Sequence, residues 1–380
     1  AIGRALTRLA SAAYRQSDYA LAQRLSRRAL TMALRPADEF VPYNVLGLVA
    51  YDEGRHAEAV PLLDRAIAAA RASHDRLNEA KATQNHALAD TELGEFGVAR
   101  ERFIGARAVA REVGDTRLEG KCLANRAMLE IKAGDPLTAI ALLDTARAVY
   151  RQSKYGPGEV NALGQLGVAY AAVGEPQRAL ATLDSALAQA RAQQLPQEEA
   201  SNLQLLAEQY RDAGDLMRAL DYLARAQALN ASLGLEDDRG TALRDAGEIY
   251  LALGQTSLAR QHGLDALAVH QRSASLLEQL VDWLLLAHVA ERERRSVGVD
   301  SSLGAAREIA GRLATRDARD RVTLASAEIA DRSGTPRDVL AALDSWGTDV
   351  ATTPAGDARA LALRARAYRR LGMLDSAALI

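Results

Sequence analysis

Few residues in this sequence have types and spacings suited to catalysis or metal binding. There is one cysteine, Cys122, and there are six histidines. A catalytic cysteine needs a lowered pKa and a nearby base, and the spacing around Cys122 supplies neither. The histidines show no i, i+4 pairing with a carboxylate and no cysteine companions, which disfavours a metal site. Gly164 and Gly167 follow no strand, so they do not indicate a phosphate loop. The sequence predicts no enzyme activity and no cofactor in this chain.

Polar pairs at helical spacing offer binding chemistry instead. Three pairs stand four residues apart: Lys81 with Asn85, Lys121 with Asn125, and Asn161 with Gln165. This spacing puts both members of a pair on one face of a helix, one turn apart. An ammonium beside an amide can bind a peptide backbone or a carboxylate. We predict a partner-binding site here; the alternative is that these are solvated polar residues on an exposed helix face.

The same face changes character farther along the chain. It continues through Arg244, Asp245 and Glu248, and then through an apolar stretch around Trp283 to Leu286. That stretch could form a second contact surface, but core packing of a degenerate unit is the favoured explanation. The mixed-charge run at residues 291–295 is most simply a solvated helix end.

A 40-residue repeat in the sequence defines the helices that must position these residues. Glycines mark it, and an alanine follows each of the first six after five residues. The glycines are Gly54, Gly94, Gly134, Gly174, Gly214, Gly254 and, two periods later, Gly334. Small residues also recur seven before each glycine and twelve after each of the first six, with a large apolar residue usually nine after the glycine. Self-similarity at a fixed period is the signature of a repeat architecture.

Each unit is predicted to be two antiparallel helices, A and B, joined at the glycine. The composition is rich in strong helix formers and only 4% aromatic, without the alternating patterns of strands. Glycine supplies the left-handed conformation that ends helix A, and Pro136, Pro176 and Pro336 then occupy the first position of helix B. Small residues let the helix axes approach closely. The fold class is therefore an all-α, right-handed α-solenoid of antiparallel helix pairs.

We expect residues 1–380 to form a single solenoid of about ten units. Their boundaries are 1–37, 38–75, 76–115, 116–155, 156–195, 196–235, 236–274, 275–315, 316–352 and 353–380. The eighth unit is degenerate, with Arg294 in place of the glycine and an irregular stretch from Ser296 to Ser302 that we expect to form a longer loop. The last unit stops partway into its helix B at 377–380 without a polar cap, so we expect the chain to continue beyond Ile380.

The pattern resembles the tetratricopeptide repeat (TPR), which has a small residue at position 8, tyrosine at 11, a glycine turn, alanine at 20 and alanine at 27. Tyr170, Tyr210 and Tyr250 fall at position 11. The period of 40 instead of 34 resembles the extended repeats of kinesin light chain-like and bacterial signalling proteins. Lys81, Asn85 and Asn125 also match the carboxylate clamp of chaperone-binding members, whereas Asn161 and Gln165 depart from it.

Charge and composition narrow the possible partners. The 47 Lys and Arg residues against 49 Asp and Glu residues leave a net charge of -2, which disfavours nucleic acid and anionic membranes as partners. The lone cysteine and the lack of a long apolar stretch favour a cytoplasmic location.

We therefore predict a protein–protein interaction scaffold that binds a peptide or domain on its concave helix-A surface. The alternative is the sensor arm of a larger bacterial protein with a fused C-terminal effector domain. Similar arrays precede caspase-like CHAT protease domains or are attached to signalling ATPases and transcription regulators.

Overall fold

The computed structural model describes residues 2–16, 18–32, 35–313, 315–344, 346 and 354–373. These residues form α-helices and no strands. The helices are α1 (Ile2–Arg15), α2 (Tyr19–Leu30), α3 (Pro36–Asp52), α4 (His56–Ala72), α5 (Arg76–Glu92), α6 (Phe96–Glu112), α7 (Thr116–Lys132), α8 (Pro136–Gln152), α9 (Gly156–Ala172), α10 (Pro176–Ala192), α11 (Pro196–Asp212), α12 (Leu216–Leu233), α13 (Glu236–Ala252), α14 (Thr256–Arg272), α15 (Leu276–Arg292), α16 (Ser296–Leu313), α17 (Arg316–Ser333), α18 (Pro336–Ala342) and α19 (Pro354–Arg370). The helix B expected to begin near 377–380 lies outside the described residues.

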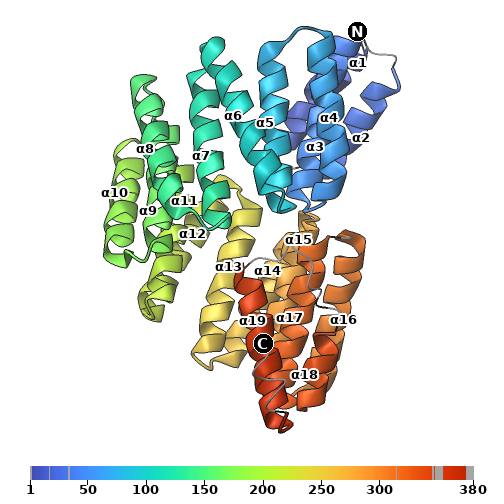
Figure 1. Cartoon of the computed structure of the whole chain (residues 1–380), viewed down its shortest axis with the longest axis vertical. Helices are drawn as coiled ribbons and strands as arrows, with labels where there is room; N and C mark the ends of the chain where they lie inside the picture. Colours follow the sequence, from blue (N-terminus) through green and yellow to red (C-terminus); the bar gives the residue numbers. More distant parts are fainter. Residues whose placement is uncertain are drawn as a thin grey trace. The chain divides into compact units, whose positions relative to one another are not determined.

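Consecutive helices pack against each other as pairs (Figure 1). The odd-numbered helices are the A helices of the repeat, and the even-numbered helices are the B helices. By packing, the chain forms two compact units, residues 1–242 and residues 243–380. The prediction of an all-α solenoid of antiparallel pairs is confirmed. None of the described helices is both long enough and apolar enough to cross a membrane.

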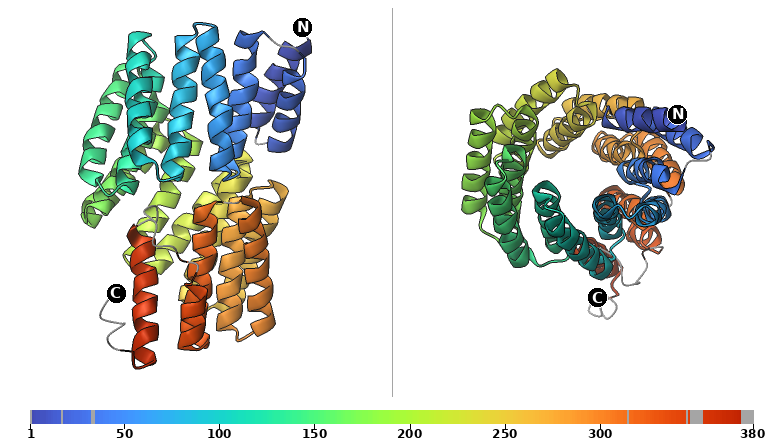
Figure 2. Two further views of the ribbon diagram at one scale, coloured as in Figure 1. Left: turned by 45° about the vertical axis from the view of Figure 1, so that its right-hand side comes forward. Right: turned by 90° about the horizontal axis from the view of Figure 1, so that it is seen from above.

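The A helices of neighbouring pairs also touch one another. In residues 1–242 this row of contacts runs from α1 through α3, α5, α7 and α9 to α11, and in the second unit from α15 through α17 to α19. Among the described residues no comparable contact joins one B helix to the next. The A helices therefore form the tighter side of each stack, and Figure 2 shows the helices of residues 1–242 following a curved path.

The turn between helices A and B has the geometry that the glycine spacing predicts. Gly134 adopts φ +84°, and the backbone N–H of the next residue, Asp135, donates to the Glu130 carbonyl at 2.7 Å. The Asp135 side chain then accepts from Thr138 N and caps α8. This one turn ends helix A and starts helix B.

The eighth unit corrects one expectation. Residues 296–302 are not an irregular loop, because α16 begins at Ser296. Arg294 takes the left-handed conformation itself, with φ +57°, so the turn keeps its ordinary length. A side chain in this region costs about 1 kcal/mol relative to glycine, and the packing of α15 against α16 offsets that cost.

The recurring small residues form the seam between the helices of a pair. Ala127 of α7 and Ala139 and Ala146 of α8 are fully buried in one cluster with Leu143. In the next pair the approach is closer still, because a Cβ added to Gly167 would lie 2.6 Å from Leu183 Cγ. The small and large positions of the repeat are therefore packing positions, as the sequence predicts.

Replacing Ala139 with leucine should lower the free energy of unfolding by roughly 1 to 3 kcal/mol, because the seam has no room for added methyl groups. Ala148 lies on the same helix and is exposed, so Ala148→Leu is the matched control and should change stability by less than about 0.5 kcal/mol. Urea unfolding followed by circular dichroism measures both. Equal effects of the two substitutions would show that the seam is assigned to the wrong face.

Candidate functional site

The candidate site is the row of A-helix residues thirteen and nine positions before each turn glycine in residues 1–242. Lys81 is half-buried on α5, and Lys121 is exposed on α7. Neither ammonium forms an ion pair within the part of the chain that the structure describes. The whole sequence has only four lysines, the other two being Lys132 and Lys154, so half of them lie in this row.

The amides of this row are arranged differently from one helix to the next. Asn85 is only 8% exposed, and its Nδ2 donates to Asn44 Oδ1 on the preceding A helix at 3.0 Å. Asn125, one helix farther along, is half-buried. On α9, Gln165 Nε2 donates to Asn161 Oδ1 at 3.0 Å, while Gln165 Oε1 is buried with no hydrogen bond to any described residue.

The structure thus separates the predicted residues into two groups. Asn85 is turned toward α3 and has a partner, so it is not the open amide that the spacing suggested. Lys121, Asn125 and the Asn161–Gln165 pair keep polar atoms available. Asn44, which the sequence analysis missed, joins the row through its bond to Asn85; its place ten residues before the glycine, one off the register, concealed it.

Lys121 has a perturbed electrostatic environment. Desolvation by the surrounding protein lowers its pKa, against the opposing charges of Cys122 and Asp52. The side chain is nevertheless exposed to solvent. An open ammonium with reduced hydration fits a position on the hollow side of a stack, where neighbouring helices exclude part of the bulk water. Such a charge gains more from an incoming carboxylate than a fully hydrated one does.

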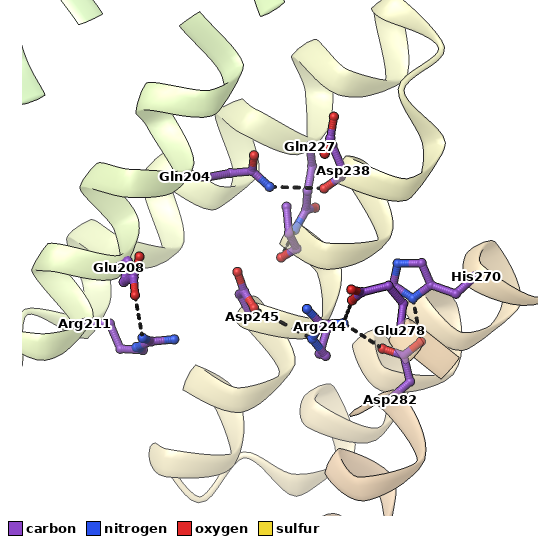
Figure 3. A network of polar contacts seen from close by, with 11 residues as sticks. Gln204, Glu208, Arg211, Gln227, Asp238, Arg244, Asp245, His270, Glu278 and Asp282 are labelled. Carbon is purple, nitrogen blue, oxygen red and sulfur yellow. Dashed lines mark hydrogen bonds and ion pairs between the residues drawn. The ribbon is translucent and has the colours of Figure 1, made fainter. Parts of the chain in front are cut away.

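The thiol of Cys122 and the side chain of Arg244 both belong to the interior. Burial raises the pKa of Cys122 to about 12, which makes its thiolate inaccessible at neutral pH. The sequence analysis placed Arg244 on the binding face, and this is wrong: the residue is 8% exposed and turns into the core of residues 243–380. There it pairs with Glu278 and lies 3.6 Å from Asp282 (Figure 3).

A histidine and a carboxylate complete that buried network. His270 Nδ1 lies 2.6 Å from Asp282 Oδ2, and both side chains are fully buried. Burial alone would lower the pKa of His270. The hydrogen bond to Asp282 and the negative charge of Asp282 raise it by more than that, so the pKa lies above its ordinary value. Neither group is open to solvent, so the pair is part of the packed interior of residues 243–380.

The repeat explains why this pair occurs where it does. Its members occupy facing positions, one late in a B helix and one twelve residues later in the next A helix. Other units fill the same two positions with Ala70 and Ala82, with Ala110 and Cys122, or with Tyr150 and Ala162. Histidine and aspartate thus replace an apolar contact with a matched polar one.

The prediction about histidine pairing needs one further correction. His86 Nε2 lies 3.6 Å from Asp90 Oδ1, an i, i+4 pair, and His86 Nδ1 lies 3.4 Å from Asp64. Burial lowers the pKa of His86, so the ring is neutral at pH 7. Within the described residues no group of three His, Cys, Asp or Glu side chains is placed to hold a metal ion.

Antiparallel helix pairs stacked side by side define the class of helical-repeat proteins. The family model of the tetratricopeptide repeat matches residues 38–118 and 121–192. Residues 38–192 thus carry the signature of the tetratricopeptide repeat, and packed helix pairs with the same turns continue through the rest of the described chain. No curated protein matches the sequence at a significant level.

Several solved structures share this fold. A Rap protein in complex with Competence and Sporulation Factor has a TM-score of 0.58 and 14% identity, over 97% of this chain and 99% of that chain. The apo form of RapI has a TM-score of 0.53 and 14% identity, over 71% and 97%. The apo form of the quorum sensor NprR from B. thuringiensis has a TM-score of 0.53 and 13% identity, over 89% and 95%. At such identities the likeness shows the fold alone.

A double-mutant cycle tests the buried pair. His270→Ala and Asp282→Ala should each destabilise the protein by about 3 to 5 kcal/mol, since each leaves a buried partner uncompensated. The double variant restores the Ala70–Ala82 arrangement, so its loss should be smaller than the sum of the two single losses.

The coupling energy should also depend on pH. Because the folded pKa of His270 is raised, the stabilisation is fully present below the unfolded pKa and is lost as the pH rises through the folded value. The free energy of unfolding of the wild type, the two single variants and the double variant, measured at pH 6 and at pH 9, gives the coupling energy at each pH. Additive losses at both pH values would show that the two side chains do not interact.

Proposed function

We propose that this chain is an interaction scaffold that binds a peptide, or an extended segment of a partner protein, on the A helices of residues 1–242. The observation that carries the proposal is the open, incompletely hydrated ammonium of Lys121, with the Asn125 amide one turn away. A charge kept in such a place without a described ion-pair partner is poised for a ligand.

The chemistry of the row suits an extended chain. Amides such as Asn125 and Gln165 both donate and accept, so they can pair with the N–H and C=O groups of a peptide backbone. Lys81 and Lys121 would bind a carboxylate of the same ligand, from an acidic side chain or a free C-terminus. The occupied Asn85 and the Asn161–Gln165 pair replace two elements of a terminal-carboxylate clamp, which favours an acidic segment over a strict C-terminal motif.

The relatives agree with a binding role. A Rap protein of the same fold is complexed with Competence and Sporulation Factor, and NprR is a quorum sensor. We infer that this chain likewise acts by binding and not by catalysis, and Cys122 is too strongly buried to contradict that. A sensor arm of a larger bacterial protein, with an effector such as a CHAT protease or a signalling ATPase, would use the same row of residues.

Selection of a random peptide library displayed on phage against the full chain tests the proposal. Among the selected peptides we expect a class whose affinity falls at least about tenfold when Lys81→Glu and Lys121→Glu are combined, because both ammonium groups become repulsive to a carboxylate. Fluorescence anisotropy with the synthetic peptides measures the affinity, and circular dichroism checks that helicity is unchanged.

The matched control combines Arg65→Glu on α4 with Lys154→Glu. Both residues are exposed and lie outside the row, and the change in net charge is identical. The control should leave binding within about twofold of the wild type. The proposal is wrong if no peptide is selected, or if the control weakens binding as much as the Lys81 and Lys121 substitutions do.

A further inference from the structure

A second hollow lies wholly within residues 243–380. It has a volume of about 400 Å³ and is bordered by α13, α15, α17 and α19, all of them A helices. Val281, Leu285 and His288 on α15 occupy the same register positions as the lysine and amide row of the first unit, and so do Arg321, Ala325 and Glu328 on α17. The repeat therefore presents the same inner face in both units, with different chemistry.

The floor of this groove is apolar. Leu284 and Leu285 from α15 are nearly buried, and Leu251 and Leu324 border them from α13 and α17. The sequence left open whether the stretch at 283–286 was core or contact surface, and both descriptions apply: the leucines pack into the core and also form the floor. A volume of this size admits a few side chains of a ligand.

The rim is dominated by exposed arginines, namely Arg292, Arg321, Arg332 and Arg359. The groove also includes two carboxylates, Glu248 and Glu328. Burial lowers the pKa of His288 to about 4, so the imidazole is neutral at pH 7. Four arginines against two glutamates leave the groove with two net positive charges, in a chain whose net charge is -2.

Two of these arginines already have a partner in the groove: Arg359 pairs with Glu328, and Arg332 donates to His288 Nδ1 at 3.3 Å. The other donors are used less, because Arg332 lies 3.8 Å and Arg292 3.9 Å from Glu291, both too far for good hydrogen bonds. Each guanidinium has five N–H donors, and the one short contact of Arg321 is to Asp317 on its own helix, at 2.7 Å. The planar forks can therefore still bind a carboxylate in bidentate geometry.

We propose that this groove is a second binding site, for a segment of a partner protein in which an apolar side chain is flanked by aspartate or glutamate. The apolar side chain would contact Leu284, Leu285 and Leu324, and the carboxylates would pair with Arg292 and Arg332 on the rim. The site does not depend on the lysine and amide row, because all of its residues belong to residues 243–380.

The chemistry argues against other occupants. Nucleic acid would meet Glu248 and Glu328 beside the arginines, and it would leave the leucine floor unused. A small inorganic anion would use the rim alone and would fill little of the volume. Only a ligand with both apolar and acidic groups matches floor and rim together.

The peptide selection described above, carried out on the full chain, tests this site with its own variants. We expect a distinct class of peptides enriched in apolar residues next to Asp or Glu. Combining Arg292→Gln with Arg332→Gln should weaken them at least about tenfold, and so should Leu324→Ala, which shortens the floor. Exchanging their acidic residues for Gln and Asn should have the same effect.

Two controls separate this site from the first. Arg307→Gln with Arg312→Gln removes two exposed charges from α16, a B helix of the same unit, and should leave binding unchanged. The substitutions of Lys81 and Lys121 should also leave this class unaffected. If every selected peptide responds only to Lys81 and Lys121, or none is acidic, the second site is overturned while the first stands. If the selection instead yields no peptide that responds to Lys81 and Lys121, while acidic peptides respond to Arg292 and Arg332, the first site is overturned and the second stands.

Discussion

The close approach of paired helices at small residues is the constraint on which the rest of this structure depends. In α7 and α8, Ala127, Ala139 and Ala146 remove the side-chain bulk that would hold the helix axes apart, and Leu143 fills the remaining space. The 40-residue period repeats this seam in each successive pair. Because it fixes which face of each helix is buried, it also fixes which face is left for a partner.

The contacts between neighbouring A helices follow from the same constraint. The A helices meet one another along each unit, and the B helices of the described chain do not, so the A helices converge on one side. Residues thirteen, nine and six positions before the turn fall on that side in every unit. The first two of these positions carry lysine and asparagine on both α5 and α7, whereas they carry valine and leucine on α15 and arginine and alanine on α17. One scaffold therefore offers two surfaces of different chemistry.

The fold could be predicted from the sequence because it rests on periodicity. The turns at Gly134 and its equivalents, the proline starts and the buried small residues all follow from local rules that agree with the repeat. Even the contact between His270 and Asp282 could have been predicted from the sequence, since both residues occupy positions that carry alanine in another unit. The turn at Arg294 could not be predicted, because an arginine in the left-handed region depends on the packing of the helices on either side.

The candidate site was less predictable, for physical reasons. A shift of one residue rotates a side chain by about 100° around the helix axis, so the register locates a face but not each contact. Arg244 stands one position from Asp245 and turns into the core instead of toward the groove. The bond from Asn85 to Asn44 joins two helices and depends on their separation, which spacing within one helix does not contain. Side-chain hydration, as at Lys121, requires the assembled stack.

The central claim is that the A helices of residues 1–242 hold the ligand, and NMR of ¹³C-methylated lysines tests it most directly. The chain has lysines only at positions 81, 121, 132 and 154, so each signal can be assigned by single substitution. Addition of a selected acidic peptide should shift the signals of Lys81 and Lys121 and raise the lowered pKa of Lys121, because a bound carboxylate favours the charged ammonium. Movement of the Lys132 and Lys154 signals, with those of Lys81 and Lys121 unchanged, would contradict the account.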